Sequence, residues 1–261
     1  MIRFAPRLLA ACAFMLLAHA ASAQERHPWI TDNPRLEKNA WFSNLASGDT
    51  VTSPFVVRFG LTGIGIAAVK QAVEGTGHHH LLIDRDLPLD FTEPLPFTDQ
   101  YVHFGKGQME AILDLPDGEH TLRLVFADHR HIPNFVYSDV LRIRVQGRSA
   151  RSVDALKRRE VSVLAPAADA TVRPPFALAL HAAGFNVSHT AITEPDTGHF
   201  RVRLEPATGE PVVFDLTGGD TELWLSPPAG AYRVSVAFMD NRVPGQVLAQ
   251  SATTRFTVLE R

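Results

Sequence analysis

The chain has very little cysteine and no marked excess of charge of either sign. Its 261 residues include one cysteine, Cys12, which excludes a disulfide framework and a cysteine-based zinc or iron–sulfur site. The 25 basic and 28 acidic residues give a net charge of −3, which argues against nucleic acid as a partner. No internal apolar run reaches the roughly 18 residues of a membrane-spanning helix, so no membrane span is expected.

Catalytic sequence motifs are also missing. The sequence has no Gly-x-Ser-x-Gly elbow, phosphate-binding loop, dinucleotide fingerprint or His-Glu-x-x-His pair. Three acidic residues, Asp84, Asp86 and Asp90, follow a run of histidines, but they lie in a proline-rich stretch. We expect these carboxylates to be solvated and the protein to be non-enzymatic.

The first residues of the chain are typical of a secretory signal peptide. Arg3 and Arg7 precede an apolar run, and small residues at 21–23 form a cleavage site. Lipid attachment to Cys12 is an alternative, but it would leave only about four apolar residues between Arg7 and the cysteine. We expect cleavage before Gln24 and a mature protein in the periplasm or outside the cell.

The remainder of the chain is an internal repeat. Residues 50–83 align without a gap onto residues 171–204, and residues 110–128 align onto residues 222–240 after a loop that is shorter in the second copy. Two copies of this kind predict two domains of one fold. The expected division is a signal peptide (1–23), an N-terminal extension (24–41), a His-rich domain (42–147), a basic linker (148–159) and a degenerate second domain (160–261). The linker is expected to be solvated, with contact to an anionic lipid or glycan as the alternative.

Both copies have the alternating pattern of β-strands. Apolar residues occupy every second position in residues 55–61 and 176–180, and no segment has a helical period. Six or seven short strands in about 100 residues predict an immunoglobulin-like β-sandwich. The expected fold is therefore all-β, with two tandem immunoglobulin-like domains. Residues 228–232 resemble the tyrosine corner of such sandwiches, and residues 116–120 repeat that turn with His120 in the tyrosine position.

The second copy indicates which histidines of the first copy belong to the core. Alternate residues of a strand share a face, and Arg201 and Arg203 cannot occupy the core face of their strand. Phe200 therefore faces the core, and so does His79, which aligns with it. We expect His79 and His120 to be hydrogen-bonded core residues.

His78 and His80 lie on the opposite, outward face of the same strand. Their Cβ atoms are expected to be roughly 6.5–7 Å apart, close enough for both imidazoles to reach one ion. Three further histidines are candidates to complete the site: His103, His129 and His131. The second copy retains none of His80, His103, His129 and His131, so the fold does not need them. That pattern is typical of a site confined to one copy, although neutral drift gives the same pattern.

Neutral imidazole is a ligand for copper, zinc, nickel and iron. The mature chain has no cysteine and only two methionines, Met109 and Met239, so a soft Cu(I) site is disfavoured. An all-imidazole group favours Cu(II) or Zn(II), with copper ahead on intrinsic affinity. The prediction is a metal-binding protein whose ion is held on the first domain. The alternative is an interaction module without a metal. In either case the second domain could dock to another periplasmic or envelope protein.

Three separated strings in the first copy carry a family resemblance. Residues 75–84, 103–108 and 116–124, followed by the His-x-Pro of residues 131–133, resemble in this order the bacterial domain-of-unknown-function family 4399. The resemblance covers about residues 42–146, and the second copy is similar to a degenerate member. It implies a domain and a site but no reaction. The order of turns and strands is also distantly similar to CopC-type periplasmic copper carriers, which implies copper.

Overall fold

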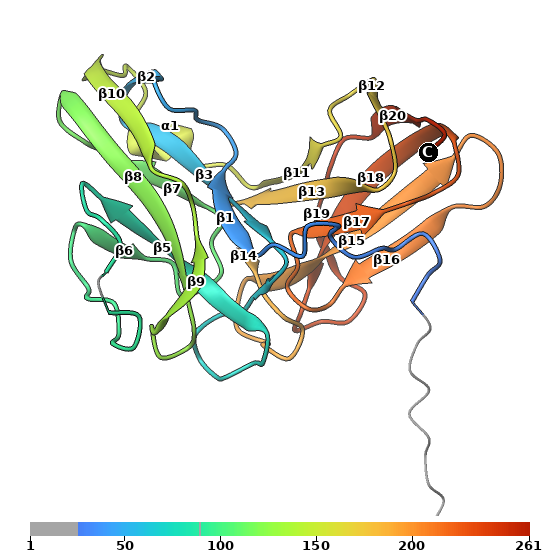
Figure 1. Cartoon of the computed structure of the whole chain (residues 1–261), viewed down its shortest axis with the longest axis horizontal. Coiled ribbons are helices and arrows are strands. Elements are labelled where there is room, and N and C mark those ends of the chain that lie inside the picture. Colours follow the sequence, from blue (N-terminus) through green and yellow to red (C-terminus); the bar gives the residue numbers. More distant parts are fainter. Residues whose placement is uncertain (1–25, 89) are drawn as a thin grey trace, which may run out of the picture.

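A computed structural model describes residues 26–88 and 90–261, so the predicted signal peptide and Cys12 lie outside the described residues. The described chain consists of β-strands and one short helix, and it forms two sheet-rich halves that lie side by side (Figure 1). The predicted all-β fold with two tandem sandwiches is confirmed. Among the described residues, no helix has the length and apolar character needed to cross a membrane.

The first copy is a sandwich of a small and a large sheet. The small sheet has the order β1-β3-β7, and the large sheet has the order β2-β10-β8-β5-β4, with β6 beside β5 and β9 beside β8. The strands are β1 (Asn39–Phe42), β2 (Thr50–Ser53), β3 (Phe55–Thr62), β4 (Gly65–Ile66), β5 (Thr76–Ile83), β6 (Tyr101–His103), β7 (Glu110–Leu113), β8 (Gly118–Ala127), β9 (Pro133–Tyr137) and β10 (Leu141–Arg148).

The second copy repeats this topology strand for strand. Its small sheet has the order β11-β13-β17, and its large sheet has the order β12-β20-β18-β15-β14, with β16 beside β15 and β19 beside β18. The strands are β11 (Glu160–Ala165), β12 (Ala170–Val172), β13 (Phe176–Ala183), β14 (Asn186–Val187), β15 (Thr197–Pro206), β16 (Val212–Leu216), β17 (Glu222–Leu225), β18 (Gly230–Asp240), β19 (Val247–Gln250) and β20 (Thr254–Val258).

The inner faces of the two sheets meet in an apolar core in each copy. His79 on β5 lies opposite Phe126 on β8, and Phe200 on β15 lies opposite Phe238 on β18. This equivalence confirms the alignment of His79 with Phe200. Buried apolar side chains continue from one copy into the other, although each sheet of the described chain contains strands of one copy only.

The two copies contact each other through a pseudo-twofold pair of hydrogen bonds. The amide of Ile66 donates to the carbonyl of Gly219 (2.8 Å), and the amide of Val187 donates to the carbonyl of Gly107 (2.9 Å). Both glycines have positive φ, 98° at Gly107 and 80° at Gly219. A Cβ on either glycine would lie 2.0 Å from a carbonyl oxygen of the other copy. Only glycine allows this close approach. The interface between the copies therefore uses equivalent glycines from both.

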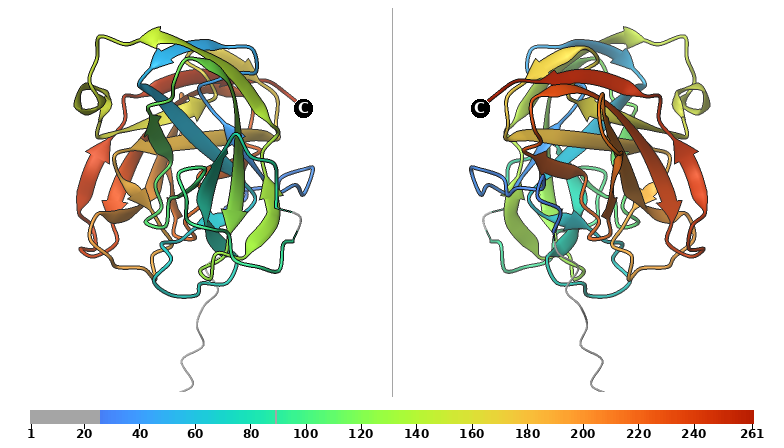
Figure 2. Two further views of the ribbon diagram at one scale, coloured as in Figure 1. Left: turned by 90° about the vertical axis from the view of Figure 1, so that its left-hand side faces the viewer. Right: turned by 90° about the vertical axis from the view of Figure 1, so that its right-hand side faces the viewer.

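The segment before β1 is ordered against the second copy. The amide of Thr31 donates to the carbonyl of Trp224 (3.0 Å), and the amide of Ser226 donates to the carbonyl of Trp29 (2.8 Å). Residues 29–31, here called the cap segment, thereby add to the outer edge of β17. Figures 1 and 2 show this segment in blue, before it reaches β1.

The basic linker is exposed along most of its length, with one buried residue. It contains a one-turn helix, α1 (Val153–Leu156), whose N-cap Ser152 accepts a hydrogen bond from the amide of Ala155 (3.3 Å). Leu156 is buried, because the helix lies against β3 of the first copy. Leu156 therefore attaches an otherwise exposed linker to the first copy.

Candidate metal centre

Strand β5 places His78 and His80 on the face of the large sheet that is turned away from the main core. Both lie on the predicted outward face, but this face is covered, because both side chains are 0% exposed. A second, smaller apolar cluster covers this face, in which Leu82 of β5 packs with Leu95 from the loop between β5 and β6. The loop folds back over the sheet and buries both histidines.

Strand β6 brings the third histidine directly beside the strand pair. His103 is the cross-strand partner of His80, and side chains opposite each other in an antiparallel pair are in contact range. Its ring lies over Gly105, where an added Cβ would come within 2.2 Å of the imidazole. The missing side chain at Gly105 therefore makes room for the His103 ring.

The fourth histidine comes from the tight turn between β8 and β9. Asp128 holds this turn, because its Oδ1 accepts hydrogen bonds from the amides of Arg130 (2.8 Å) and Ile132 (3.0 Å). His131 has a φ of 66°, a strained conformation for a residue with a side chain. Its carbonyl accepts a hydrogen bond from the amide of Leu95 (2.9 Å). The turn and the covering loop are thereby joined at the site.

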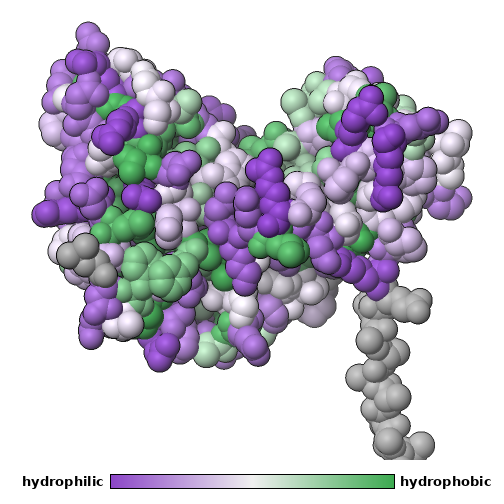
Figure 3. Space-filling view, in the orientation of Figure 1, coloured by the Kyte–Doolittle hydropathy of each residue, from purple (hydrophilic) through white to green (hydrophobic). Residues whose placement is uncertain are grey.

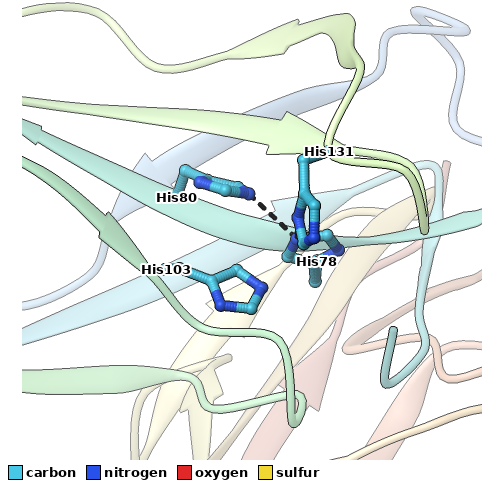
Figure 4. A group of neighbouring side chains, drawn as sticks. All are labelled: His78, His80, His103 and His131. Carbon is cyan, nitrogen blue, oxygen red and sulfur yellow. Dashed lines mark hydrogen bonds between the residues drawn. The ribbon is translucent and has the colours of Figure 1, made fainter. Parts of the chain in front are cut away.

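The four rings point toward one another (Figure 4). His78 Nε2 lies 2.9 Å from His80 Nε2 and 3.2 Å from His131 Nδ1. One ligand nitrogen from each of these residues and His103 can be chosen so that all four lie within 4.8 Å of one another. Tetrahedral zinc with bonds of about 2.0–2.1 Å needs nitrogens roughly 3.4 Å apart. The observed separations bracket that value.

Without an ion, the ring nitrogens of this group are poorly satisfied. A neutral imidazole nitrogen is either a donor or an acceptor, so His78 Nε2 cannot form good hydrogen bonds to two other imidazoles with one proton or one lone pair. Among the described residues, the buried Nε2 of His103 has no hydrogen-bond partner. Buried polar atoms in proteins are normally paired. The arrangement is therefore suited to an added cation.

Burial keeps these imidazoles neutral. Desolvation, followed by the charges of the neighbouring histidines, lowers the pKa of His78 to about 2 and that of His80 to about 3. Burial is also the largest cause that lowers the pKa values of His103 and His131. A metal binds the lone pair of neutral imidazole. The group can therefore accept an ion at neutral pH with little competition from protons.

The second copy fills the same place with an ion pair. Arg201 and Asp215 are cross-strand partners, as His80 and His103 are in the first copy. The Arg201 guanidinium donates two hydrogen bonds to the Asp215 carboxylate, at 2.6 and 2.9 Å. The position aligned with Gly105 is Thr217, so the second copy keeps no glycine that would make room for a histidine ring. The facing histidine pair of the first copy therefore corresponds to a facing ion pair in the second copy.

The remaining histidines have other surroundings. His129, predicted as a ligand, is exposed and is not part of the group of four, because the turn directs His131 rather than His129 toward β5. His120 is buried, and it contacts Asp84 Oδ2 (2.8 Å) and the carbonyl of Pro116 (2.9 Å), which confirms a hydrogen-bonded core residue. Tyr232 makes the same contact to the equivalent proline carbonyl in the second copy.

His79 differs from its prediction. It is a core residue, 1% exposed, but neither of its ring nitrogens has a hydrogen-bond partner. Its ring lies between Phe59 and Phe126, with centroid distances of 5.3 and 5.2 Å. The expected hydrogen bond is absent because the neighbours at this position are aromatic rings.

Aromatic residues form the open side of the site. The ring of Phe97 lies 5.2 Å from that of His103 and 4.8 Å from that of His131, and its side chain is largely exposed. Exposed Phe135 and Tyr137 lie on β9 of the same copy. Figure 3, in the orientation of Figure 1, shows hydrophobic surface on the side of the molecule where β9 lies. No sequence pattern singled out Phe97, since the loop that carries it has no counterpart of similar length in the second copy.

Gly105→Ala tests whether the position of His103 matters. The added methyl group would push the imidazole away from the group, and displacing a ligand through its support weakens metal sites by about 10–100-fold. We expect a loss of Cu(II) or Zn(II) affinity of this size in a calorimetric titration. Thermal unfolding of the metal-free variant is the control for folding. Unchanged affinity would show that His103 is not a ligand.

Comparisons with known proteins agree with the repeat. A family model described as "Domain of unknown function (DUF4399)" matches residues 57–146 and again residues 178–258. A comparison with curated proteins found no match. The two matched regions cover the cores of both copies.

Several solved structures are similar at low identity. Latent PorU from Porphyromonas gingivalis is 14% identical with a TM-score of 0.31, and the match covers 86% of this chain but only 20% of PorU. Fibronectin(III)-like modules of CbhA from Clostridium thermocellum are 14% identical with a TM-score of 0.25, covering 85% of this chain and 94% of that one. A two-domain fibronectin type III segment of chicken tenascin is 14% identical with a TM-score of 0.21, covering 84% and 97%. These matches lend no support to a likeness with CopC-type copper carriers.

Proposed function

The chain belongs to the DUF4399 family, with two copies of that domain, and we propose that its first copy binds Cu(II) or Zn(II) as a non-enzymatic metal-binding protein. The ligands are His78, His80, His103 and His131. The observation that carries the proposal is the convergence of four imidazoles in one buried place, with nitrogens 2.9 and 3.2 Å apart.

The donor set supports these two ions. All four donors are neutral imidazoles, which suit divalent copper and zinc, and copper is ahead on intrinsic affinity. His78 and His80 offer Nε2 from a rigid strand, and His131 offers Nδ1 from the turn. His103 and His131 are only partly buried, so an ion has a route to the site from their side. A site of this kind favours binding and exchange over catalysis.

The second copy supports a site more than neutral drift. Drift would replace the histidines without regard to one another, whereas Arg201 and Asp215 replace a facing pair with a facing ion pair. A buried cluster of neutral imidazoles and an exposed ion pair are two solutions for the same two positions. This paired replacement supports a site that is confined to the first copy.

Metal analysis of the purified, untagged mature protein tests the proposal. We expect about one equivalent of copper or zinc, and a titration of the metal-free protein should return it. Binding to the folded state alone should raise the free energy of unfolding by roughly 2.7 kcal/mol at a free metal concentration one hundred times Kd. The absence of bound metal and of any shift in the unfolding temperature with either ion would contradict the proposal and favour the alternative, an interaction module without a metal.

Export is part of the same proposal, because the predicted signal peptide would place the site where Cu(II) and Zn(II) are not kept reduced or chelated by cytosolic thiols. N-terminal sequencing of protein from the extracellular and periplasmic fractions tests this. A mature N-terminus near Gln24 is expected. Protein that stays in the cytoplasm with its first 23 residues intact would contradict export.

A further inference from the structure

The outer edge of β7 in the first copy is an unpaired sheet edge. The amide of Phe59 donates to the carbonyl of Met109 (2.7 Å), and bonding to the neighbouring strand alternates along an antiparallel pair. Ala111 and Leu113 are therefore bonded to β3, whereas the N–H and C=O groups of Glu110 and Ile112 point outward. Within residues 26–88 and 90–261, these outward groups make no backbone hydrogen bond.

The second copy shows what such an edge can hold. Its equivalent strand, β17, receives the cap segment, with Ile30 forming a β-bridge to Leu225 between the two hydrogen bonds described above. The positions aligned with Trp224 and Ser226 are Ile112 and Asp114. The first copy therefore has the same acceptor and the same donor on β7, without a segment beside them.

A groove runs along this unpaired edge. It has a volume of about 710 Å³, and it lies between β7, the linker and the turn between β13 and β14. Apolar side chains of Ile112, Val153 and Phe185 line it. From Glu110 to Asp114 the edge spans roughly 13 Å, enough for about five residues of an added strand.

The charges of the groove are mostly positive. Four cationic side chains line it: Lys106, Lys157, Arg158 and Arg159. The one carboxylate of the lining, that of Glu110, faces Arg58 at 3.4 Å. Two of the cations are also paired, Lys157 with Asp154 at 2.7 Å and Arg159 with Asp196 at 3.8 Å. Within the described residues, Lys106 and Arg158 form no ion pair. The groove therefore complements an anionic segment rather than a neutral or basic one.

We propose that this groove binds an extended, acidic segment of a partner protein, which adds to β7 as a strand. The segment donates an N–H group to the carbonyl of Ile112 and accepts from the amide of Asp114, as the cap segment does on β17. Its apolar side chains contact Ile112 and Val153, and its carboxylates contact cationic side chains of the groove such as Lys106 and Arg158. Strand addition to a sheet edge is a general mode of peptide recognition.

A display library of random nine-residue peptides, panned against the immobilised full chain, tests the proposal. We expect enrichment of acidic sequences with alternating apolar residues. A synthetic copy of the most enriched peptide should bind the wild-type chain at least tenfold more tightly than Ile112→Pro. The proline ring would stand where the outward N–H group of Ile112 points and would block the path of the added strand, while the ladder to β3 does not use that group.

The second variant is Lys157→Glu with Arg158→Glu, which decides the question if Ile112→Pro does not fold. It should also weaken the peptide at least tenfold. Its control, Arg142→Glu with Arg242→Glu, makes the same change in net charge at exposed positions outside the groove and should bind normally.

Three results would overturn the proposal. The first is a library that yields no acidic enrichment, and the second is a selected peptide that binds these groove variants as well as the wild type. The third is a wild-type chain that dimerises in sedimentation while Ile112→Pro stays monomeric, since the occupant would then be a second copy. Unchanged peptide affinity in His78→Ala with His80→Ala is expected, because the metal site and the groove are separate.

Discussion

Replacing His78 and His80 together by alanine is expected to lower the affinity for Cu(II) or Zn(II) by about a thousandfold or more. Four-ligand structural sites are bound by about 10–16 kcal/mol, so the loss of half of the ligands removes several kcal/mol, and each 1.4 kcal/mol is tenfold in Kd. The strand pair is also the rigid part of the site, since His103 and His131 come from its neighbours. A competition titration against a chelator of known affinity measures the change.

The matched control is His199→Ala with Arg201→Ala, at the aligned positions of the second copy. It removes two polar side chains from the same face of the same strand type and should leave metal affinity unchanged. The metal-free double variant of the first copy loses two fully buried rings, so its free energy of unfolding should fall by about 2–4 kcal/mol from the cavities that are left. Denaturant unfolding checks that it is still folded. Binding that survives this double change and is lost with His79→Ala would place the metal inside the sandwich.

The site was partly predictable from the sequence. Strand alternation put His78 and His80 on one face, and the repeat showed that the fold does not depend on them. The choice between His129 and His131 depended on the turn held by Asp128 and on a positive φ at His131, which residue spacing does not encode. The burial of the strand pair depended on the loop that carries Leu95, a segment without a repeat partner to guide its interpretation.

The fold was predictable wherever the two copies could be compared. Alternating apolar residues and the aligned turns gave the strands and their core faces, because each pattern appears twice. The cap segment and α1 were not predictable, because each occurs once: the cap segment pairs with β17 only, and Leu156 is buried within an otherwise basic linker. Unique segments that pack against a repeat carry no periodic signal.

Exchanging His79 in the core of the first copy is expected to have the second large effect, a change in the free energy of unfolding. His79 and Phe59 are in contact in the first copy, and the aligned residues of the second copy are Phe200 and Leu180, all of them buried. Phe59→Leu with His79→Phe transfers the second copy's pair at nearly constant volume and removes two buried ring nitrogens that lack partners. We expect the free energy of unfolding at pH 7 to rise by roughly 1–3 kcal/mol. His79→Ala, which leaves a cavity, should lower it by a similar amount.

The same exchange should change the response to acid. Burial lowers the pKa of His79 to about 3, whereas an unfolded histidine has a pKa near 6.5. Between these two pKa values, His79 binds a proton in the unfolded state but not in the folded state. His79 therefore has little effect on the free energy of unfolding above pH 6.5, and it lowers this free energy progressively as the pH falls toward 3. At pH 5 this amounts to about 2 kcal/mol.

The stability advantage of Phe59→Leu with His79→Phe should therefore grow by about that amount between pH 7 and pH 5 in denaturant unfolding of the metal-free proteins. The other buried histidines are common to both proteins and cancel in the difference, so a pH-independent advantage would mean that His79 finds a proton acceptor in the fold.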